Sequence, residues 1–310
     1  HNGDVACDHY HRYKEDVKMM ADMGIRAYRF SIAWSRILPE GRGEVNQSGI
    51  DFYNALIDEL LKYNIKPCLT LFHWDLPFAL HRMGGWQNPD VVQWFGEYAK
   101  VVAENFSDIC EYFITINEPQ CVVGLGHLSG VHAPGVKLPV AQTFLVAHHL
   151  LMAHGQAVIN LRRYAVRPVK IGFAPTGGVA YPYTDRPEDI EAAKKVYFGF
   201  YNPIDNWTWN VSWFSDPVFL GHYPEEGLKK FAPYLPKITQ EDMELIYQPL
   251  DFMGQNIYNG YYVRAGADGE PEFVDRAPGF PKTGSDWPVT PEAFYYGIKF
   301  LTERYPLPLY

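Results

Sequence analysis

Tyr112-Phe113-Ile114-Thr115-Ile116-Asn117-Glu118-Pro119 is the stretch that decides the fold. It runs from a compact apolar segment directly into two polar side chains and a proline. A short apolar segment of this kind is typical of a strand that is buried in a sheet. We therefore predict a buried strand over residues 112–116, with Asn117 and Glu118 at its carboxyl end.

The same pattern repeats on both sides of this stretch. Similar apolar strands are predicted at residues 27–32, 67–72, 169–174 and 250–255, and a further one begins at 308–310. Helices are predicted between them: one that ends at Gly24, one from Ser48 to Asn64, one that opens at Asn88-Pro89, one over about 140–164, and one capped by Thr290-Pro291. Short buried strands that alternate with helices indicate a parallel sheet, because each crossover must pass over a sheet face.

Polar residues at the strand ends separate a barrel from an open doubly wound sheet. They follow three of the strands: His73-Trp74-Asp75 after the first, Asn117-Glu118 after the second, and Asn256 with Tyr258 after the third. No Gly-rich turn follows the early strands, as a dinucleotide-binding fold would need. Barrel enzymes build their active sites at the carboxyl ends of the strands. We therefore expect an α/β fold, a (β/α)8 TIM barrel, that forms a single domain over residues 1–310.

Composition limits the classes of function. The chain has 310 residues, of which 47% are hydrophobic, so it can bury a large core. Its net charge is −9 and it has no Lys/Arg cluster, which argues against a nucleic-acid partner. No apolar stretch is long enough to span a membrane. Aromatic residues make up 16% of the chain, which fits either stacking on sugar rings or an aromatic-rich core. For the cluster between Tyr197 and Phe219 we predict packing of the rings on one another.

The cysteines and histidines show no ligand spacing. Cys7, Cys68, Cys110 and Cys121 are widely spaced and form no C-x-x-C pair. We expect buried, reduced thiols in a cytoplasmic protein. The histidines match no metal-binding pattern, so we expect neither a metal nor a cofactor.

Three residues at or within the strands carry chemistry. Apolar walls around Glu118 would favour its protonated form, which a general acid needs, although an ion pair with a neighbouring arginine is the alternative. His73 could donate a hydrogen bond to a sugar hydroxyl beside a wall formed by Trp74, or it could be a buried structural imidazole. Arg29 lies in an apolar strand, so we expect it to meet an anion, either structural or catalytic.

Four segments together resemble the signature segments of glycoside hydrolase family 1. They are Tyr28-Arg29-Phe30-Ser31-Ile32-Ala33-Trp34-Ser35-Arg36, His73-Trp74-Asp75-Leu76-Pro77, Thr115-Ile116-Asn117-Glu118-Pro119 and Asp251-Phe252-Met253-Gly254-Gln255-Asn256-Ile257-Tyr258. The segments follow the family's order, and the resemblance extends from residue 1 to residue 310.

This resemblance implies a retaining β-glycosidase that acts on terminal β-D-glucosides or β-galactosides. Glu118 matches the acid/base, Asn117 the residue that binds the sugar 2-hydroxyl, and His73 a residue that binds another ring hydroxyl. The remaining matches are Trp74 and Asn256, at the substrate, and Arg29 and Tyr258, which hold the nucleophilic carboxylate. A glutamate at position 118 also argues against the plant thioglucosidase branch. The expected partner is a β-glycoside or oligosaccharide.

The family's nucleophile, a glutamate in a T/S-E-N-G motif, has no match in the sequence. In the family this motif follows a segment like Tyr305–Tyr310. The first and eighth strands of the barrel have no match either, so about six of the eight strand–helix units are expected. A retaining site needs two carboxyl groups roughly 5–5.5 Å apart. We therefore expect a fragment without normal turnover, whose open sheet edges favour a homo-oligomer.

Three other interpretations stay open at this point. One is a phospho-β-glycosidase of the same family. A second is an inactive carbohydrate-binding protein built on half of the site. A third is a fragment that aggregates through its unpaired strand edges.

Overall fold

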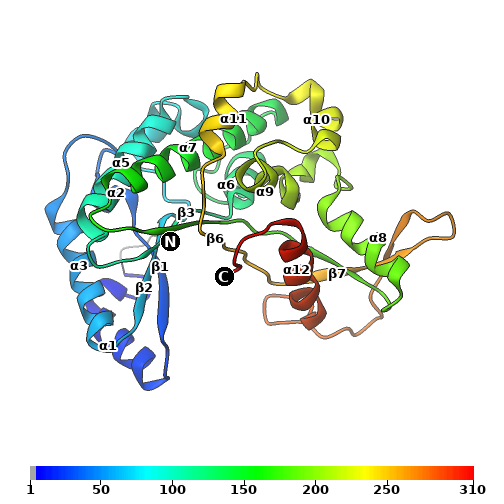
Figure 1. Cartoon of the computed structure of the whole chain (residues 1–310), viewed down its shortest axis with the longest axis horizontal. Helices are drawn as coiled ribbons and strands as arrows, with labels where there is room; N and C mark the ends of the chain where they lie inside the picture. Colours follow the sequence, from blue (N-terminus) through cyan, green and yellow to red (C-terminus); the bar gives the residue numbers. More distant parts are fainter. Residues whose placement is uncertain (1–4) are drawn as a thin grey trace. The chain divides into compact units, whose positions relative to one another are not determined.

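The computed structural model describes residues 5–310, which form two compact units (Figure 1). Unit 1 comprises the described residues up to Asn117 together with Gln156–Gly172. Unit 2 comprises Glu118–Gly155 and Phe173–Tyr310. The chain passes between the units at three places: after Asn117, within helix α7 (Val140–Tyr164) and within strand β4 (Lys170–Ala174). Each unit is described separately, and the expectation of one barrel domain stays a prediction.

Unit 1 contains the first three parallel strands. They are β1 (Ala27–Ser31), β2 (Lys66–Phe72) and β3 (Tyr112–Asn117). β2 pairs with β1 on one side and with β3 on the other, both in parallel. The beginning of β4 extends this sheet, because the amide of Lys170 donates to the carbonyl of Glu111 at 2.7 Å. All of these strands were predicted, and their carboxyl ends lie at one edge of the sheet.

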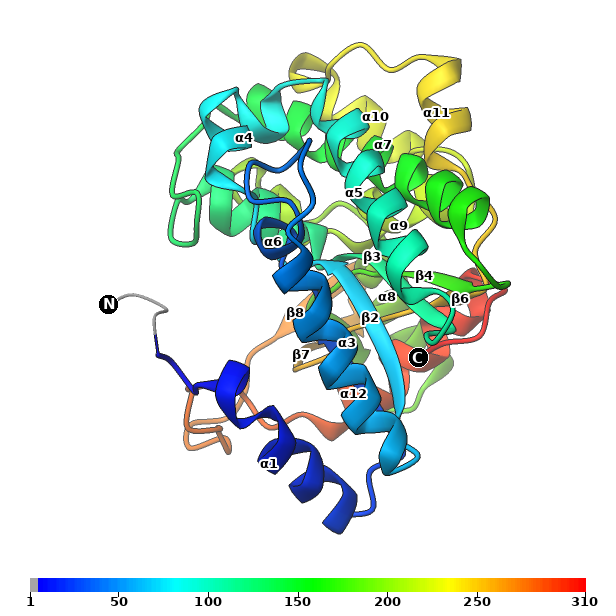
Figure 2. The same cartoon turned by 90° about the vertical axis from the view of Figure 1, so that its left-hand side faces the viewer.

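Unit 1 also contains several helices. They are α1 (His9–Asp22), α2 (Trp34–Ile37), α3 (Gln47–Lys62), α4 (Phe78–Arg82), the short 3-10 helix η1 (Gly85–Gln87) and α5 (Val91–Phe106). In Figure 2, α3 runs along β2, and α1 packs against α3. Val17, Leu56, Leu60 and Ile65 form a buried apolar cluster between these elements. Burial of these side chains provides the main driving force for folding of this part of unit 1.

The structure confirms most of the predicted helix ends in unit 1 and corrects two helix starts. Gly24 and Asn64 have φ angles of 78° and 57°, the left-handed conformation that ends a helix. Ser48 is not a cap, because α3 begins at Gln47 after Asn46. The third helix begins at Val91, later than predicted, because the Asn88 side chain accepts a hydrogen bond from the amide of Asp90 in a turn before it.

In unit 2, the end of β4 lies beside β6 (Phe252–Met253). The amide of Gly254 donates to the carbonyl of Phe173 at 2.9 Å. On the other side, Met253 forms a parallel bridge with Leu309. The predicted strand over residues 308–310 is therefore confirmed as a single bridge, whereas the strand predicted at 250–255 is shorter than expected.

A second sheet in unit 2 was not predicted. It consists of β5 (Val179–Pro182), β7 (Gly260–Ala265) and β8 (Pro271–Val274). β5 and β7 are parallel, and β7 and β8 are antiparallel. Figure 1 shows helix α8 (Pro187–Phe198) near β7, which it contacts. Helix α12 (Pro291–Arg304) contacts β5 and begins after Thr290 with a proline in its first turn, as predicted.

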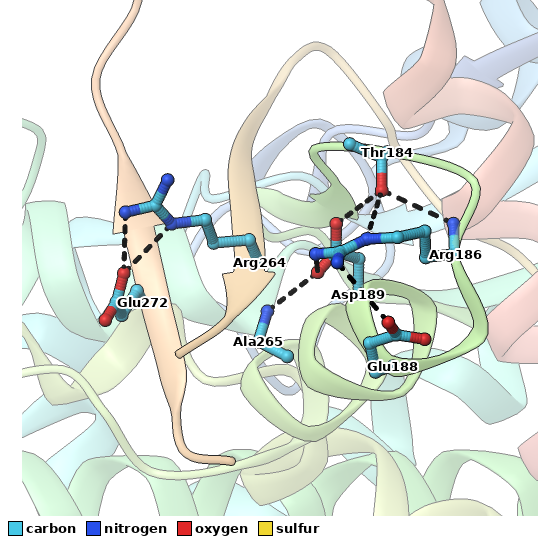
Figure 3. Close-up of polar contacts among 7 residues, drawn as sticks. All are labelled: Thr184, Arg186, Glu188, Asp189, Arg264, Ala265 and Glu272. Atoms are coloured by element: carbon cyan, nitrogen blue, oxygen red, sulfur yellow. Dashed lines mark hydrogen bonds and ion pairs between the residues drawn. The ribbon is translucent and has the colours of Figure 1, made fainter. Parts of the chain in front are cut away.

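A buried carboxylate joins α8 to β7. Asp189 is completely buried and accepts hydrogen bonds from the Thr184 hydroxyl at 2.5 Å and the Ala265 amide at 2.9 Å (Figure 3). The guanidinium of Arg186 donates to it at 3.1 Å. Burial alone would raise the pKa of Asp189, but these hydrogen bonds hold it below its ordinary value. Close by in Figure 3, Arg264 on β7 pairs with Glu272 on β8.

The aromatic cluster of the insertion packs on itself, as predicted. The insertion folds into η3 (Ile204–Trp209), α9 (Val211–Phe219), α10 (Glu225–Phe231), η4 (Ala232–Tyr234) and α11 (Gln240–Ile246). Trp207 is fully buried, and its ring stacks on Phe144 at a centroid distance of 3.8 Å. Trp213 meets both rings edge-on. Most of these aromatic side chains therefore form a core rather than an exposed binding surface.

The cysteines agree only in part with expectation. All four are free, and Cys110 and Cys121 are buried. Cys68 is partly exposed and Cys7 is exposed, so the expectation of four buried thiols is wrong for these two. Within residues 5–310, no helix has an apolar stretch that could cross a membrane.

Candidate active site

The first part of the site is a hydrogen-bonded group around Asn117 at the carboxyl ends of β1–β3 in unit 1. The buried Asn117 side chain accepts a hydrogen bond from the Arg29 guanidinium at 2.5 Å. Its amide nitrogen lies 3.2 Å from Nε2 of His73. The indole of Trp74 donates to the backbone carbonyl of Asn117 at 2.9 Å. The structure thus brings together the four predicted site residues of unit 1.

Arg29 differs from the expectation in its surroundings. It lies on β1, whose alternate residues are exposed, so the guanidinium is not buried in an apolar strand. Besides Asn117, it donates to the Thr70 hydroxyl at 2.9 Å. The argument that burial forces Arg29 to meet an anion therefore fails, because the residue is exposed. Its predicted role beside a nucleophilic carboxylate stays a prediction.

The turn after β2 is conformationally strained. Trp74 has a φ angle of 88°, a left-handed conformation that is unusual for a bulky residue. Burial is the largest influence on the Asp75 carboxyl group and raises its pKa to about 6, although nearby backbone amides act in the opposite direction. Strain of this kind persists only where the surrounding structure enforces it, and it often marks a functional site.

The second part of the site is built around Glu118 in unit 2. Glu118 also has a left-handed backbone, with a φ angle of 45°. Its amide donates to the carbonyl of Ala174 at 2.7 Å, which ties it to the end of β4. Helix α6 (Pro119–Val123) begins immediately after it. The chain therefore turns sharply at Glu118, and the side chain is left at the end of the strand.

Neutral donors bind both carboxyl oxygens of Glu118. Oε1 accepts from the Asn256 amide at 2.5 Å and from the Tyr258 hydroxyl at 3.1 Å. Oε2 accepts from the Cys121 thiol at 3.2 Å. The residue is only 4% exposed. None of these three contacts is the ion pair with an arginine that was the alternative expectation for Glu118.

The end of β6 positions the two donors to Oε1. The backbone amide of Asn256 donates to the carbonyl of Pro175 at 3.1 Å, and the backbone carbonyl of Asn256 accepts from the Thr176 hydroxyl at 3.1 Å. These contacts fix the backbone of Asn256 against the segment that follows β4. Tyr258 follows two residues later in the sequence and reaches the same oxygen. The predicted site residues of unit 2 are thus brought together, with Tyr258 on Glu118 in this structure.

Sequence reasoning missed two residues of this group. Cys121 was treated only as a buried thiol, although its position three residues after Glu118 could have indicated a contact across one helical turn. Trp287 lies edge-on to Tyr258 at a centroid distance of 5.2 Å, and 46% of its surface is exposed. An exposed indole beside Tyr258 offers a flat apolar surface to a ligand.

Each of the two groups suits its own chemistry, proton transfer in unit 2 and polar recognition in unit 1. A carboxyl group is a side chain that can serve as a general acid or base. The amide, imidazole and guanidinium of unit 1 suit recognition of hydroxyl groups. Within residues 5–310, no group of three or more His, Cys, Asp or Glu could hold a metal ion.

Comparisons with known proteins agree with this chemistry. Residues 1–310 match the profile of glycosyl hydrolase family 1. A 1,4-beta-D-glucan glucohydrolase of Thermotoga neapolitana is 45% identical over 305 residues, which cover 98% of this chain and 69% of that protein. Beta-glucosidase A of Thermotoga maritima is 44% identical over 308 residues, covering 99% of this chain and 66% of the relative. The chain thus spans about two thirds of the length of these relatives.

Solved structures give the same result. A β-glucosidase from Thermotoga maritima in complex with glucoimidazole has a TM-score of 0.86 and 43% identity, with 100% of this chain and 68% of that chain covered. The same enzyme in complex with castanospermine also gives a TM-score of 0.86, at 43% identity, with 100% and 67% covered. The predicted α/β fold of the (β/α)8 barrel class is therefore confirmed over this partial length.

Proposed function

Because the chain belongs to glycosyl hydrolase family 1, a family of retaining glycosidases, we propose that it carries the acid/base half of a β-glucosidase site. The observation that supports this most directly is the setting of Glu118. Its carboxyl group lies at the end of a barrel strand, is buried, and accepts hydrogen bonds from three uncharged side chains. No salt bridge to Glu118 is among the ion pairs of residues 5–310.

In the first step, the protonated carboxyl of Glu118 gives its proton to the glycosidic oxygen as the bond to the sugar C1 breaks. In the second step, the resulting carboxylate takes a proton from the water that attacks C1, while the bond between C1 and the nucleophile breaks. Asn256 and Tyr258 donate to Oε1 and stabilise the ionised form between the two steps. The same residue therefore acts first as an acid and then as a base.

The group around Asn117 supplies recognition in this proposal. Arg29 and His73 hold the side chain of Asn117, and Trp74 holds its backbone. An amide fixed in this way is suited to a sugar 2-hydroxyl, whose hydrogen bond strengthens as positive charge develops at C1. His73, which is exposed, is suited to another ring hydroxyl.

Double displacement also requires a nucleophilic carboxylate roughly 5–5.5 Å from the acid/base. The sequence contains no T/S-E-N-G motif, and we assign this role to no residue of the chain. A small anion such as azide can take the place of a missing nucleophile. It would attack C1 from the face opposite the leaving group and form a C–N bond while the C–O bond breaks.

Terminal β-D-glucosides are the proposed substrates. The names of the relatives refer to β-glucosidase and to β-1,4-glucan glucohydrolase activity. One solved neighbour contains glucoimidazole, and another contains a galacto-configured hydroximolactam, so β-galactosides belong in the same test. An exposed Trp287 beside Tyr258 offers a surface for the aglycone.

The test is azide-dependent cleavage of phenyl β-D-glucoside by the purified chain. We expect phenol and α-D-glucosyl azide to form only when azide is present. Glu118→Gln should reduce this rate by about 10²–10⁴-fold, because glutamine cannot donate the proton. Glu111→Gln is the matched control, since Glu111 is an exposed glutamate at the opposite end of β3.

Other outcomes would contradict parts of the proposal. An equal rate for the chain and for Glu118→Gln would exclude the acid/base role. Turnover without azide that is lost in Glu118→Gln would keep that role and disprove the expected lack of a nucleophile. Preferential cleavage of the 6-phosphorylated glucoside would replace the substrate class, and binding of glucoimidazole without any cleavage would indicate a carbohydrate-binding protein.

A further inference from the structure

Cys121 lies at a position where a side chain can control the conformation of Glu118. The left-handed backbone of Glu118 starts a tight turn in which its carbonyl accepts the amide of Cys121 at 3.0 Å. This turn directs the Cys121 side chain back towards the residue that begins it. The thiol reaches Oε2, whereas Asn256 and Tyr258 are both bound to Oε1. The carboxyl group is therefore held on both sides.

The thiol is suited to a group that must gain and lose a proton. Burial is the main reason that the pKa of Cys121 is raised, and the nearby Glu118 carboxylate adds to the effect. Cys121 therefore stays protonated and cannot compete as a nucleophile. A thiol is a weak donor and a weak acceptor, so it can face either protonation state of the carboxyl.

We propose that Cys121 is a positioning residue. Its thiol fixes the Oε2 oxygen of Glu118 for proton transfer to the leaving group. This proposal rests on the acid/base role of Glu118. The thiol does not touch the reacting atoms and acts only through the carboxyl rotamer. Oε2, with the weaker donor, is then the oxygen that carries the transferable proton, and Oε1 stays bound to Asn256 and Tyr258.

The first experiment tests the contact itself by infrared spectroscopy of the S–H stretch. The difference between the chain and Cys121→Ala isolates the Cys121 band from those of the other thiols. We expect this band to lie at lower frequency than that of an S–H group bonded to a neutral acceptor, and to shift upwards in Glu118→Gln. Cys110→Ser is the matched control, because Cys110 is also buried and burial raises its pKa to about 12.

The second experiment tests the consequence for proton transfer. The azide-dependent rate is measured on phenyl β-D-glucoside, whose leaving group needs a proton, and on the 2,4-dinitrophenyl glucoside, whose leaving group does not. We expect Cys121→Ala to slow only the first substrate, by about three- to tenfold, as for loss of one weak hydrogen bond. Cys121→Ser, which keeps a donor of similar size, should recover most of that rate.

The two experiments separate this proposal from the proposed function. If no substrate is cleaved but the S–H band shifts in Glu118→Gln, the acid/base role fails and the thiol still holds the carboxyl. An S–H band unchanged by Glu118→Gln overturns the contact. Equal slowing of both substrates by Cys121→Ala, with no recovery in Cys121→Ser, overturns the positioning role and indicates a general packing defect.

Discussion

The carboxyl groups of Asp75 in unit 1 and Asp189 in unit 2 have pKa values that are shifted in opposite directions. Burial raises the pKa of Asp75 to about 6 despite backbone amides beside it. Asp189 is completely buried, yet hydrogen bonds from Thr184, Ala265 and Arg186 keep its pKa below the ordinary value. The comparison shows that a guanidinium and a hydroxyl bound to a carboxylate can outweigh the effect of burial on its pKa, whereas backbone amides alone do not at Asp75.

A second buried carboxylate of unit 2 also accepts hydrogen bonds from an arginine and a hydroxyl group. Asp216 on α9 is completely buried and accepts two hydrogen bonds from the Arg304 guanidinium, at 3.0 and 2.5 Å, and one from the Tyr305 hydroxyl at 2.7 Å. These contacts join the insertion to the end of α12. Unit 1, in contrast, relies on the apolar cluster of α1 and α3. Unit 2 should therefore be the more sensitive to removal of a single charged partner.

The largest effect is expected for Arg304→Leu. This change leaves the buried Asp216 carboxylate without its cation, and we expect the free energy of unfolding of unit 2 to fall by about 4 kcal/mol. Urea unfolding followed by tryptophan fluorescence measures the loss, since Trp207 and Trp213 lie in this unit. Hydrogen exchange should show faster opening of α9 and α12, with the amides of β1–β3 still protected.

Leu60→Ala provides the opposite test in unit 1. Leu60 is fully buried in the apolar cluster, and its truncation should cost about 3 kcal/mol. Protection should then be lost first in α3 and β2. If both variants destabilise all elements equally, the two units unfold as one, and the contrast between them does not govern stability.

A smaller, pH-dependent effect is expected for Asp75→Asn. Because the folded-state pKa of about 6 lies above the ordinary value of 3.8, the folded chain binds the proton more tightly than the unfolded chain. This group therefore contributes stability that is present below about pH 4 and is lost as the pH rises through about 6. The variant cannot titrate there, so its stability relative to the parent should improve by on the order of 2 kcal/mol between pH 4 and 7. Parallel urea curves with the same pH dependence would contradict the assignment.

The smallest effect is expected for Thr184→Val, which removes one donor from Asp189. We expect a loss of about 1 kcal/mol at neutral pH. The remaining donors still lower the pKa of Asp189, so its contribution is present above the ordinary value of 3.8 and is lost as the pH falls below it. Thermal melting at pH 7 and pH 3 measures both parts. Thr184→Ser is the matched control, because it keeps the hydroxyl and should melt like the parent at both values.

The sequence was sufficient for elements with strong periodicity. The strands of unit 1 and the long helix α7 were located correctly, because their apolar runs and stripes have the lengths that strands and helices require. The sheet of β5, β7 and β8 was missed. Its strands are separated by helices and turns, and its pairing depends on contacts between distant residues such as Val179 and Gly260.

The site was predictable at the strand ends and less so elsewhere. The rule that polar residues follow barrel strands located Asn117, Glu118 and His73, and parallel pairing of β1–β3 brought their neighbours together. The exposure of Arg29 could not be predicted, because the sequence of an apolar strand does not indicate whether both of its faces are covered in the folded chain. Cys121 was missed because its contact depends on the left-handed turn at Glu118, which no composition or period reveals.

The left-handed backbone of Glu118 has a consequence for how this chain could be altered in a laboratory or by selection. A glutamate at a φ angle of 45° carries a steric penalty on the order of 1–2 kcal/mol, which glycine at the same place would not carry. Variants chosen for thermal resistance alone would be drawn towards glycine at this position and would lose the carboxyl group with the strain. Glu118 is thus a position where the residue that favours stability differs from the residue that the proposed acid/base role requires.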